Sequence, residues 1–247
     1  MPVTPDWIVP DWPAPARVRA VTTTRQGGVS QGRYASMNPA DHVDDDPQAV
    51  AENRQRLLQL LNLPAAPVWL RQVHGVAVVD AAVAGASPAA DAAYSRQPGV
   101  VCAVLTVDCL PVLLTDTAGD CVAAIHAGWR GLAAGVIEQA VAAMGLPGER
   151  LLAWLGPAIG PQAFQVGGEV RDAFLAHDQA AAAAFSQDPD GAWFADLYRL
   201  ARQRLAEYGV TKVYGGGCCS FNDAEHFFSY RRDGATGRMA SLIWLDR

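Results

Sequence analysis

Short apolar runs separated by polar turns dominate the middle of the chain, in the string TVDCLPVLLTDTAGDCVAAIHAGWRG at residues 106–131. An apolar run at 100–106 leads into it, and residues 112–114 and 121–125 flank a turn of Thr, Asp, Ala and Gly at 115–120. Short apolar runs bounded by such turn residues are typical of buried strands, although periodicity alone leaves a buried helix open. We therefore expect neighbouring strands in the interior.

Side chains with metal-binding chemistry stand beside these predicted strands. Cys109 follows the first run, and His126 ends the last one, 17 residues later. His74, which stands 35 residues before Cys109, ends a further apolar segment at 68–73. If the three ends converge, two imidazoles and one thiolate leave a fourth tetrahedral position open, as in catalytic rather than structural zinc sites. A metal held in this way lowers the pKa of its bound water and makes a nucleophile.

Other interpretations of the same residues remain open. A Cys or His beside an apolar strand is often simply packed in the core, and the spacing lacks the compactness of CxxC or HExxH. Cys109 and His126 could also form a metal-free thiolate–imidazolium pair that acts as a nucleophile on an amide or glycosyl substrate. Asp91 could orient a ligand imidazole, or it could be a surface or capping residue.

Four arginines are candidates for binding substrate or phosphate. Arg25 lies in the loop TRQGGVS, whose glycine pair lets backbone N–H groups approach an anion. Arg130 lies where a glycine-bearing turn leads into a predicted helix, which is a favourable position for an anion. Arg231 could bind phosphate with its guanidinium fork, and Arg71 stands close before His74. Surface turns and solvated arginines are the competing interpretation.

Helix and strand signals cover the rest of the chain. Asp46 with Pro47 is expected to start a helix, as is Asp196 before a helix at 197–208. A single helix is expected at 132–144. The remaining strands are predicted at the ranges 17–24, 68–70, 76–79, 151–155, 210–214 and 241–245.

Composition excludes several classes of protein. The 247 residues suffice for one sizeable core, and we expect a single domain over residues 1–247. The net charge of −6 and the absence of a basic tract disfavour nucleic-acid binding, because neutralising phosphates requires a basic face. No apolar run is long enough to cross a membrane, and the start lacks the features of a signal peptide. Five irregularly spaced cysteines indicate reduced thiols, so we expect a cytoplasmic protein.

A set of strings spread along the chain carries a family resemblance. They are, in order between residues 22 and 245, TTRQGGVS, RQVHG, ADA, TVDCLPVLL, AIHAGWRG, GPAIGP, VGGEV and FFSYRRDGATGRMASLIWL. In combination they resemble the YfiH-like laccase-domain family, also called the polyphenol oxidoreductase or purine nucleoside phosphorylase family. The resemblance covers nearly the whole chain.

The resemblance implies a fold, a metal and a reaction. The fold is a single α/β domain with mixed β-sheets layered with helices, similar to the catalytic domain of cytotoxic necrotising factor toxins. The metal is zinc, held by the residues that correspond here to His74, Cys109 and His126. The implied reactions are phosphorolysis of adenosine, inosine and methylthioadenosine by inorganic phosphate, and deamination of adenosine.

The resemblance also leaves alternatives. Some members carry the older name of copper-dependent laccase, and some are named peptidoglycan editing factor. A laccase needs a multinuclear copper cluster, so the other histidines, His42, His177 and His226, would have to contribute. A metal-stabilised module that binds a cell-wall precursor without turnover is a further possibility. Gln165 stands where the family pattern leads us to expect Glu, and Ser220 replaces Thr but keeps the hydroxyl.

Overall fold

The computed structural model describes residues 5–246, and its strands form three sheets. The largest sheet has the strand order β11-β7-β5-β6-β3-β2, the second has β1-β12-β4, and the smallest has β8-β10-β9. The strands are β1 Val18–Thr22, β2 Val78–Asp80, β3 Ala92–Ser95, β4 Val101–Thr106, β5 Leu110–Asp116, β6 Val122–Ala127, β7 Leu151–Leu155, β8 Gln165–Val166, β9 Phe185–Gln187, β10 Trp193–Ala195, β11 Lys212–Gly215 and β12 Met239–Leu245. The helices are α1 Pro47–Leu60, α2 Trp129–Ala134, α3 Val136–Met144, α4 Gly168–Leu175, α5 Leu197–Glu207 and α6 Tyr230–Asp233, with 3₁₀ turns η1 Gly32–Tyr34, η2 Gly148–Arg150 and η3 Gln179–Ala184.

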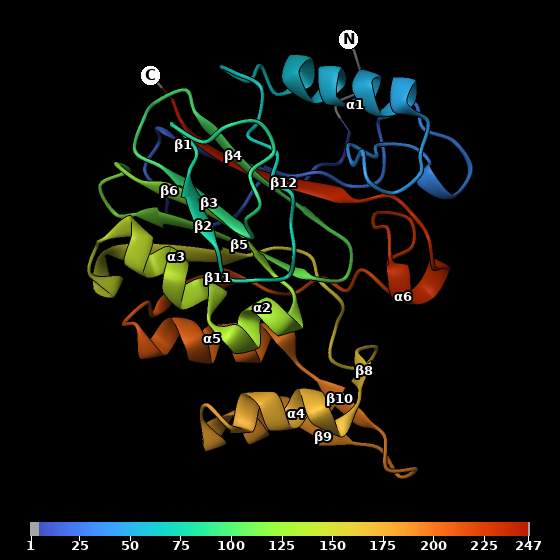
Figure 1. The fold of residues 1–247 in the computed structure, drawn as a ribbon, viewed down its shortest axis with the longest axis vertical. Helices are drawn as coiled ribbons and strands as arrows, with labels where there is room; N and C mark the ends of the chain where they lie inside the picture. Colours follow the sequence, from blue (N-terminus) through green and yellow to red (C-terminus); the bar gives the residue numbers. More distant parts are fainter. Residues whose placement is uncertain (1–4, 247) are drawn as a thin grey trace.

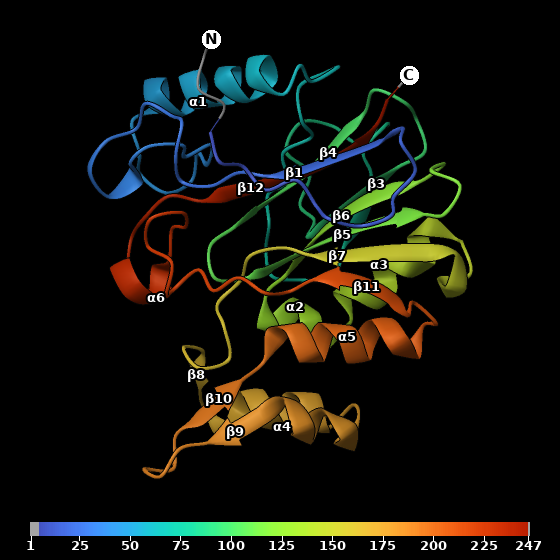
Figure 2. The ribbon, with the colours of Figure 1, turned by 180° about the vertical axis from the view of Figure 1, so that it is seen from behind.

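These elements are stacked in layers (Figures 1 and 2). Helix α1 covers one face of the β1-β12-β4 sheet, and the six-stranded sheet lies on the other side of it. Helices α2, α3 and α5 cover the far face of the six-stranded sheet, and α4 lies beyond α5 together with the β8-β10-β9 sheet. The β7–β11 and β2–β3 pairs are parallel, whereas β5 pairs antiparallel with both of its neighbours. The expected α/β fold with mixed sheets layered with helices is confirmed.

Burial on both faces explains why the central strands read as continuous apolar runs. On β4, Cys102 and Val104 face the six-stranded sheet, whereas Ala103 and Leu105 face the layer that contains α1. Every residue of β4, β5 and β6 is buried. A strand covered on both sides has no solvent face, so the usual alternation of polar and apolar residues is lost.

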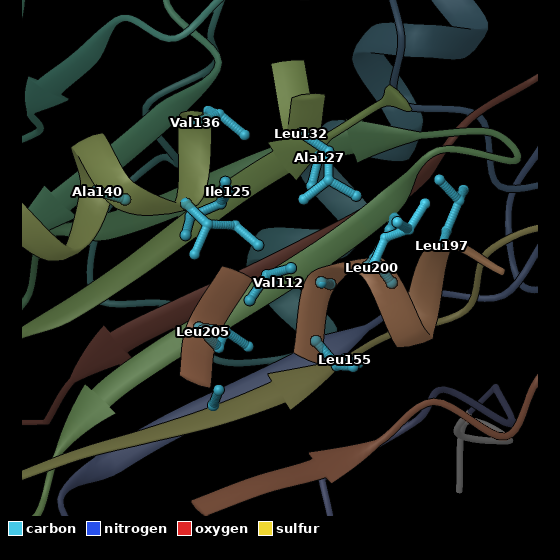
Figure 3. Close-up of a cluster of buried hydrophobic side chains, with 14 of the residues drawn as sticks. Val112, Ile125, Ala127, Leu132, Val136, Ala140, Leu155, Leu197, Leu200 and Leu205 are labelled. Atoms are coloured by element: carbon cyan, nitrogen blue, oxygen red, sulfur yellow. The ribbon is translucent and has the colours of Figure 1, made fainter. Parts of the chain in front are cut away.

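The largest core lies between the six-stranded sheet and its helices (Figure 3). Val112 of β5 and Ile125 of β6 contribute to it from the sheet, and Leu132, Val136 and Leu200 contribute from α2, α3 and α5. All five side chains are almost fully buried. This core packs α2 against the ends of β5 and β6, which is where the candidate site lies.

The helix starts were predicted well, but one helix was not. Asp46 and Asp196 cap α1 and α5 by accepting hydrogen bonds from backbone N–H groups in the first turn. The single helix expected at 132–144 is wrong, because the chain forms α2 and α3 with a break at Gly135. Gly135 has φ +102°, a left-handed conformation that ends one helix and lets the next begin in a new direction.

The strand expected at 68–70 is also wrong. The segment makes only isolated bridges, Val68 to Cys102 and Arg71 to Ala89. Beyond them, the Gln72 side chain takes the place of a strand neighbour by binding both the N–H and the C=O of Leu105. The segment that leads to His74 is therefore a loop anchored by side chains.

Two expectations from composition have a structural counterpart. No helix within residues 5–246 is long and apolar enough to cross a lipid bilayer. All five cysteines are free thiols, as their irregular spacing predicted.

The core between the two larger sheets should contribute substantially to stability. Leu113 is fully buried there, so Leu113→Ala should lower the free energy of unfolding by about 2–5 kcal/mol through lost burial and a residual cavity. Urea denaturation followed by tryptophan fluorescence measures the change. Val83→Ala is the control because Val83 is 79% exposed, and it should change stability by less than about 0.5 kcal/mol. Equal effects of the two substitutions would contradict this assignment of the core.

Candidate metal centre

The pairing of β5 with β6 brings Cys109 close to His126. In the antiparallel register, Leu110 lies opposite Ala127 and Pro111 opposite His126. Cys109 immediately precedes β5, so the start of β5 and the end of β6 place the thiol and the imidazole at the same edge of the sheet. The sequence prediction that these two residues meet follows directly from this register.

Asp91 joins the site from the other side of β6. It immediately precedes β3, and the backbone N–H of His126 donates to its carbonyl at 2.7 Å. Its carboxylate is fully buried and accepts a hydrogen bond from His126 Nδ1 at 2.8 Å. The interpretation of Asp91 as a surface or capping residue is therefore wrong, and its placement behind a candidate ligand imidazole is correct.

The same carboxylate holds the loop that carries His74. It accepts hydrogen bonds from the backbone N–H groups of Val73 at 3.2 Å, His74 at 2.9 Å and Gly75 at 2.7 Å. Three successive N–H groups turned toward one anion leave none for a strand partner, and His74 has φ +59°. This explains why His74 lies on a turn rather than at the end of a strand.

The three candidate ligands converge. Their ligand atoms lie within 4.8 Å of one another, and His74 Nε2 is 4.0 Å from Cys109 Sγ. The two imidazole rings meet edge to face with centroids 4.8 Å apart. Because Asp91 holds His126 Nδ1, the other nitrogen of that ring remains for a metal, as in many ligand histidines. His126 is buried, Cys109 is half-buried and His74 is exposed, so one side of the group is open to solvent.

A glycine keeps the surroundings of this group tight. A Cβ atom placed on Gly128 would lie 3.0 Å from Cys109 Sγ and 3.0 Å from His74 Cδ2. Such contacts are closer than most real Cβ atoms make, so a larger residue at position 128 would displace the thiol or the His74 ring. Two imidazoles, one thiol and an open side fit a zinc ion with one exchangeable position.

Electrostatics in the protein without a metal favour a charged pair. Burial raises the pKa of the Cys109 thiol, but the His126 charge and hydrogen bonds from both histidines outweigh it and lower the pKa to about 6. Burial lowers the pKa of His126, but Cys109 and Asp91 outweigh it and raise the pKa to about 9. A thiol that ionises this readily is suited both to metal binding and to nucleophilic chemistry.

Asp108 is a residue whose importance sequence reasoning missed. Its side chain accepts hydrogen bonds from Ser220 Oγ at 2.6 Å and from the backbone N–H of Arg231 at 2.8 Å. Its carbonyl accepts one from Ile159 N–H, and its φ is +66°. Asp108 thus ties three distant segments to the turn that carries Cys109. The hydroxyl kept at Ser220 has this structural use.

The four predicted arginines separate into two groups. Arg25 donates to the carbonyls of Ala35 and Ala224, and Arg231 donates to those of Ala163 and Gln165, so both guanidinium groups bind backbone. The side chains of Arg71 and Arg130 have no hydrogen-bond or ion-pair partner among residues 5–246. Both are exposed. The guanidinium of Arg130, which stands two residues after Gly128, stacks on the ring of Trp129.

Two further positions qualify the sequence analysis. Arg238 was not predicted, yet it immediately precedes β12, whose first residue Met239 pairs with Thr106 just before the Asp108–Cys109 turn. Burial lowers the pKa of Arg238, while the charges of Cys109 and Asp108 act in the opposite direction.

Gln165 contacts Arg231 through its backbone carbonyl, so this contact does not require a Glu side chain.

Residues 19–246 match the family described as "Multi-copper polyphenol oxidoreductase laccase". The chain belongs to this family.

Relatives and solved structures agree with this membership. The chain is 59% identical to a protein of Pseudomonas aeruginosa, over 97% of this chain and 98% of that protein. It is 57% identical to YfiH of Escherichia coli, over 96% of this chain and 98% of YfiH. Both relatives are named purine nucleoside phosphorylase. Neisseria meningitidis protein NMB0706 has the same fold with a TM-score of 0.95, 52% identity and coverage of 98% of this chain and 100% of that one. YlmD from Geobacillus stearothermophilus aligns with a TM-score of 0.89 and 29% identity, covering 98% and 96% of the two chains.

Asp91 should control metal affinity. Asp91→Asn removes the charge behind His126 and the acceptors for the loop at 73–75, so zinc affinity should fall by about 10–100-fold. Competition with a chromophoric chelator measures it. Asp116→Asn is a matched control, because Asp116 is equally buried and also accepts from backbone N–H groups, at Ala118, Asp120 and Cys121. A loss of zinc affinity as large in Asp116→Asn would contradict a specific role for Asp91.

Cys109 should be the reactive thiol of the metal-free protein. Its alkylation by iodoacetamide should fall as the pH drops through about 6, since only the thiolate reacts and the pKa is lowered to that value. Cys121, whose pKa burial raises to about 11, should remain unmodified at neutral pH. Peptide mass spectrometry after timed labelling separates the two, and added zinc should protect Cys109. A Cys109 rate that rises only above pH 8 would argue against the pair with His126.

Proposed function

We propose that this protein is a zinc-dependent purine nucleoside enzyme. It cleaves adenosine, inosine and methylthioadenosine with inorganic phosphate, and it deaminates adenosine. The observation that carries the proposal is the convergence of His74, Cys109 and His126 on one open-sided point, backed by Asp91. The names of the Pseudomonas and Escherichia relatives support the substrate class.

The two reactions make different demands on the site. In phosphorolysis, a phosphate oxygen attacks the anomeric carbon, the bond from that carbon to the purine breaks, and the purine leaves with a proton. In deamination, the oxygen of water adds at C6 of adenine and ammonia leaves. A zinc ion held by the three residues would supply Lewis acidity and an acidified water.

The residues of the chain supply orientation and charge. Asp91 fixes His126 Nδ1 and the turn at His74, so the two imidazoles are held before substrate arrives. Arg130 and Arg71, whose guanidinium groups have no hydrogen-bond or ion-pair partner within residues 5–246, bind the phosphate. Arg238 adds positive charge beside Cys109 and Asp108.

A pocket on the loop before His74 is the proposed site for the purine. It has a volume of about 280 Å³ and is lined by His42, Arg54, Trp69 and Arg71, among others. Trp69 offers an aromatic ring for stacking, although Arg54 already covers one of its faces at 4.8 Å. Arg238 is electrostatically linked to both regions, because its positive charge lowers the pKa of His42 in this pocket and the charge of Cys109 raises the pKa of Arg238.

The activity itself is tested with zinc-loaded protein, adenosine and phosphate. Chromatography should detect adenine with ribose 1-phosphate, and inosine or hypoxanthine. His126→Ala should reduce product formation at least about 100-fold, because it removes a metal ligand. His226→Ala, which alters a half-exposed histidine paired with Asp223, should retain full activity. No turnover of any purine nucleoside by the zinc-loaded protein would refute the proposal.

The purine pocket has its own test. Trp69→Ala should raise KM for adenosine by about 5–150-fold, corresponding to about 1–3 kcal/mol of stacking, with a smaller effect on kcat. Trp12→Ala is the matched control, since Trp12 is also half-buried but lines a different groove. Steady-state kinetics give KM for adenosine in both variants. Equal KM values would mean that the purine does not bind at Trp69.

Other proposed roles predict different results. A copper laccase would contain stoichiometric copper and oxidise polyphenols. However, neither His42 nor His226 belongs to either of the two groups of clustered metal-binding side chains in residues 5–246. A metal-free Cys109 nucleophile would keep its activity in the presence of chelators. A binding module for cell-wall precursors would bind such a precursor without turning over any nucleoside.

A further inference from the structure

A second group of potential ligands lies away from the site described above. It comprises Glu138 of α3, His177 just after α4, and Glu207 at the end of α5, and their ligand atoms lie within 4.8 Å of one another. Helices α3 and α5 cover the far face of the six-stranded sheet, and α4 lies beyond α5 (Figures 1 and 2). The three residues come from segments that are separate in sequence.

The spacing of the two exposed members suits a shared ion. His177 Nε2 lies 2.8 Å from Glu207 Oε2. Two ligand atoms bound to one tetrahedral zinc at ~2.0 Å are separated by roughly 3.3 Å, so a small outward shift would admit the ion. Without an ion the same pair forms a hydrogen bond at the surface.

An unsatisfied buried carboxylate is the independent observation that points to a ligand. Glu138 is only 6% exposed, and Arg204 binds its Oε1 at 2.7 Å. Its Oε2 is buried and has no partner among the described residues. A buried carboxylate oxygen left without a partner is costly, so an unpaired one indicates a missing cation or water.

A neighbouring side chain also has a buried oxygen without a hydrogen-bond partner. Gln203 also has a buried side-chain oxygen without a partner among the described residues, and it lines a small cavity together with His177, Arg204 and Glu207. The volume of this cavity is about 10 Å³, which is the space that one water molecule or one ion occupies.

The net charge of this group is compatible with a divalent cation. The two carboxylates outnumber the single guanidinium of Arg204, and the imidazole of His177 binds a metal in its neutral form. We propose that Glu138, His177 and Glu207 form a second divalent-cation site, of the zinc class, which fastens the segment after α4 to α3 and α5. This proposal is independent of the enzymatic function, because no residue of the first site takes part.

The test is the metal stoichiometry of the full chain. Chelator-treated protein is dialysed to equilibrium against Zn²⁺, and bound metal is measured by atomic absorption. The wild type should bind two equivalents, whereas His177→Ala and Glu207→Gln should each bind one. His226→Ala is the matched control and should bind two, because His226 pairs with Asp223 at the surface but has no third ligand among residues 5–246.

Co²⁺ distinguishes loss of the second site from damage to the first. The site with Cys109 should give a thiolate-to-cobalt charge-transfer band, which the oxygen-rich site cannot produce. This band should be unchanged in His177→Ala and absent in Cys109→Ala. Wild-type protein that binds a single equivalent, or His177→Ala that binds as much as the wild type, would overturn the proposal. In that case the buried Glu138 oxygen is satisfied by water alone.

Discussion

The carboxylate of Asp91 is the interaction on which the site depends. It is fully buried at the start of β3, and it binds His126 Nδ1 together with three consecutive backbone N–H groups around His74. Burying an ionised carboxylate is unfavourable unless several donors compensate for it. Here burial raises the pKa of Asp91, and the hydrogen bonds from His126 and the loop outweigh that effect and keep the pKa below its ordinary value. The two histidines are therefore held by one shared anion.

The packing of the sheet explains how strands that are covered on both faces can hold reactive side chains at their ends. The strands that carry Cys109 and His126 are buried on both faces, so their positions are fixed by packing against a second sheet and against α2, α3 and α5. Gly128 then lets the start of α2 come within contact of both the thiol and His74. The rigid strands fix the positions of the two side chains, and the glycine lets the helix start lie close beside them.

Part of the site could be predicted from the sequence because it depends on local pairing. Cys109 and His126 flank one hairpin, and the turn between their strands was visible in the residues at 115–120. The convergence of His74 was also predicted, but for the wrong reason. Its loop is shaped by Asp91, which stands 17 residues further along, and no local pattern reveals a carboxylate that binds backbone at that distance.

The arginines show what local sequence cannot predict, namely contacts between distant segments. Arg25 and Arg231 were reasonable candidates because of their neighbours in sequence, yet their guanidinium groups bind backbone carbonyls of remote segments. Arg238 was overlooked because its proximity to Cys109 depends on the pairing of β12 with β4, between segments more than 130 residues apart. Long-range pairing of this kind is decided by the whole fold.

The names attached to this family point to different chemistries, a copper polyphenol oxidoreductase and a purine nucleoside phosphorylase. The central claim is that His74, Cys109 and His126 bind one zinc ion. X-ray absorption at the zinc edge, on protein loaded with one equivalent and carrying His177→Ala to remove the second group, tests it most directly. We expect one sulfur at ~2.3 Å and two imidazole nitrogens at ~2.0–2.1 Å. A first shell without sulfur would contradict the account.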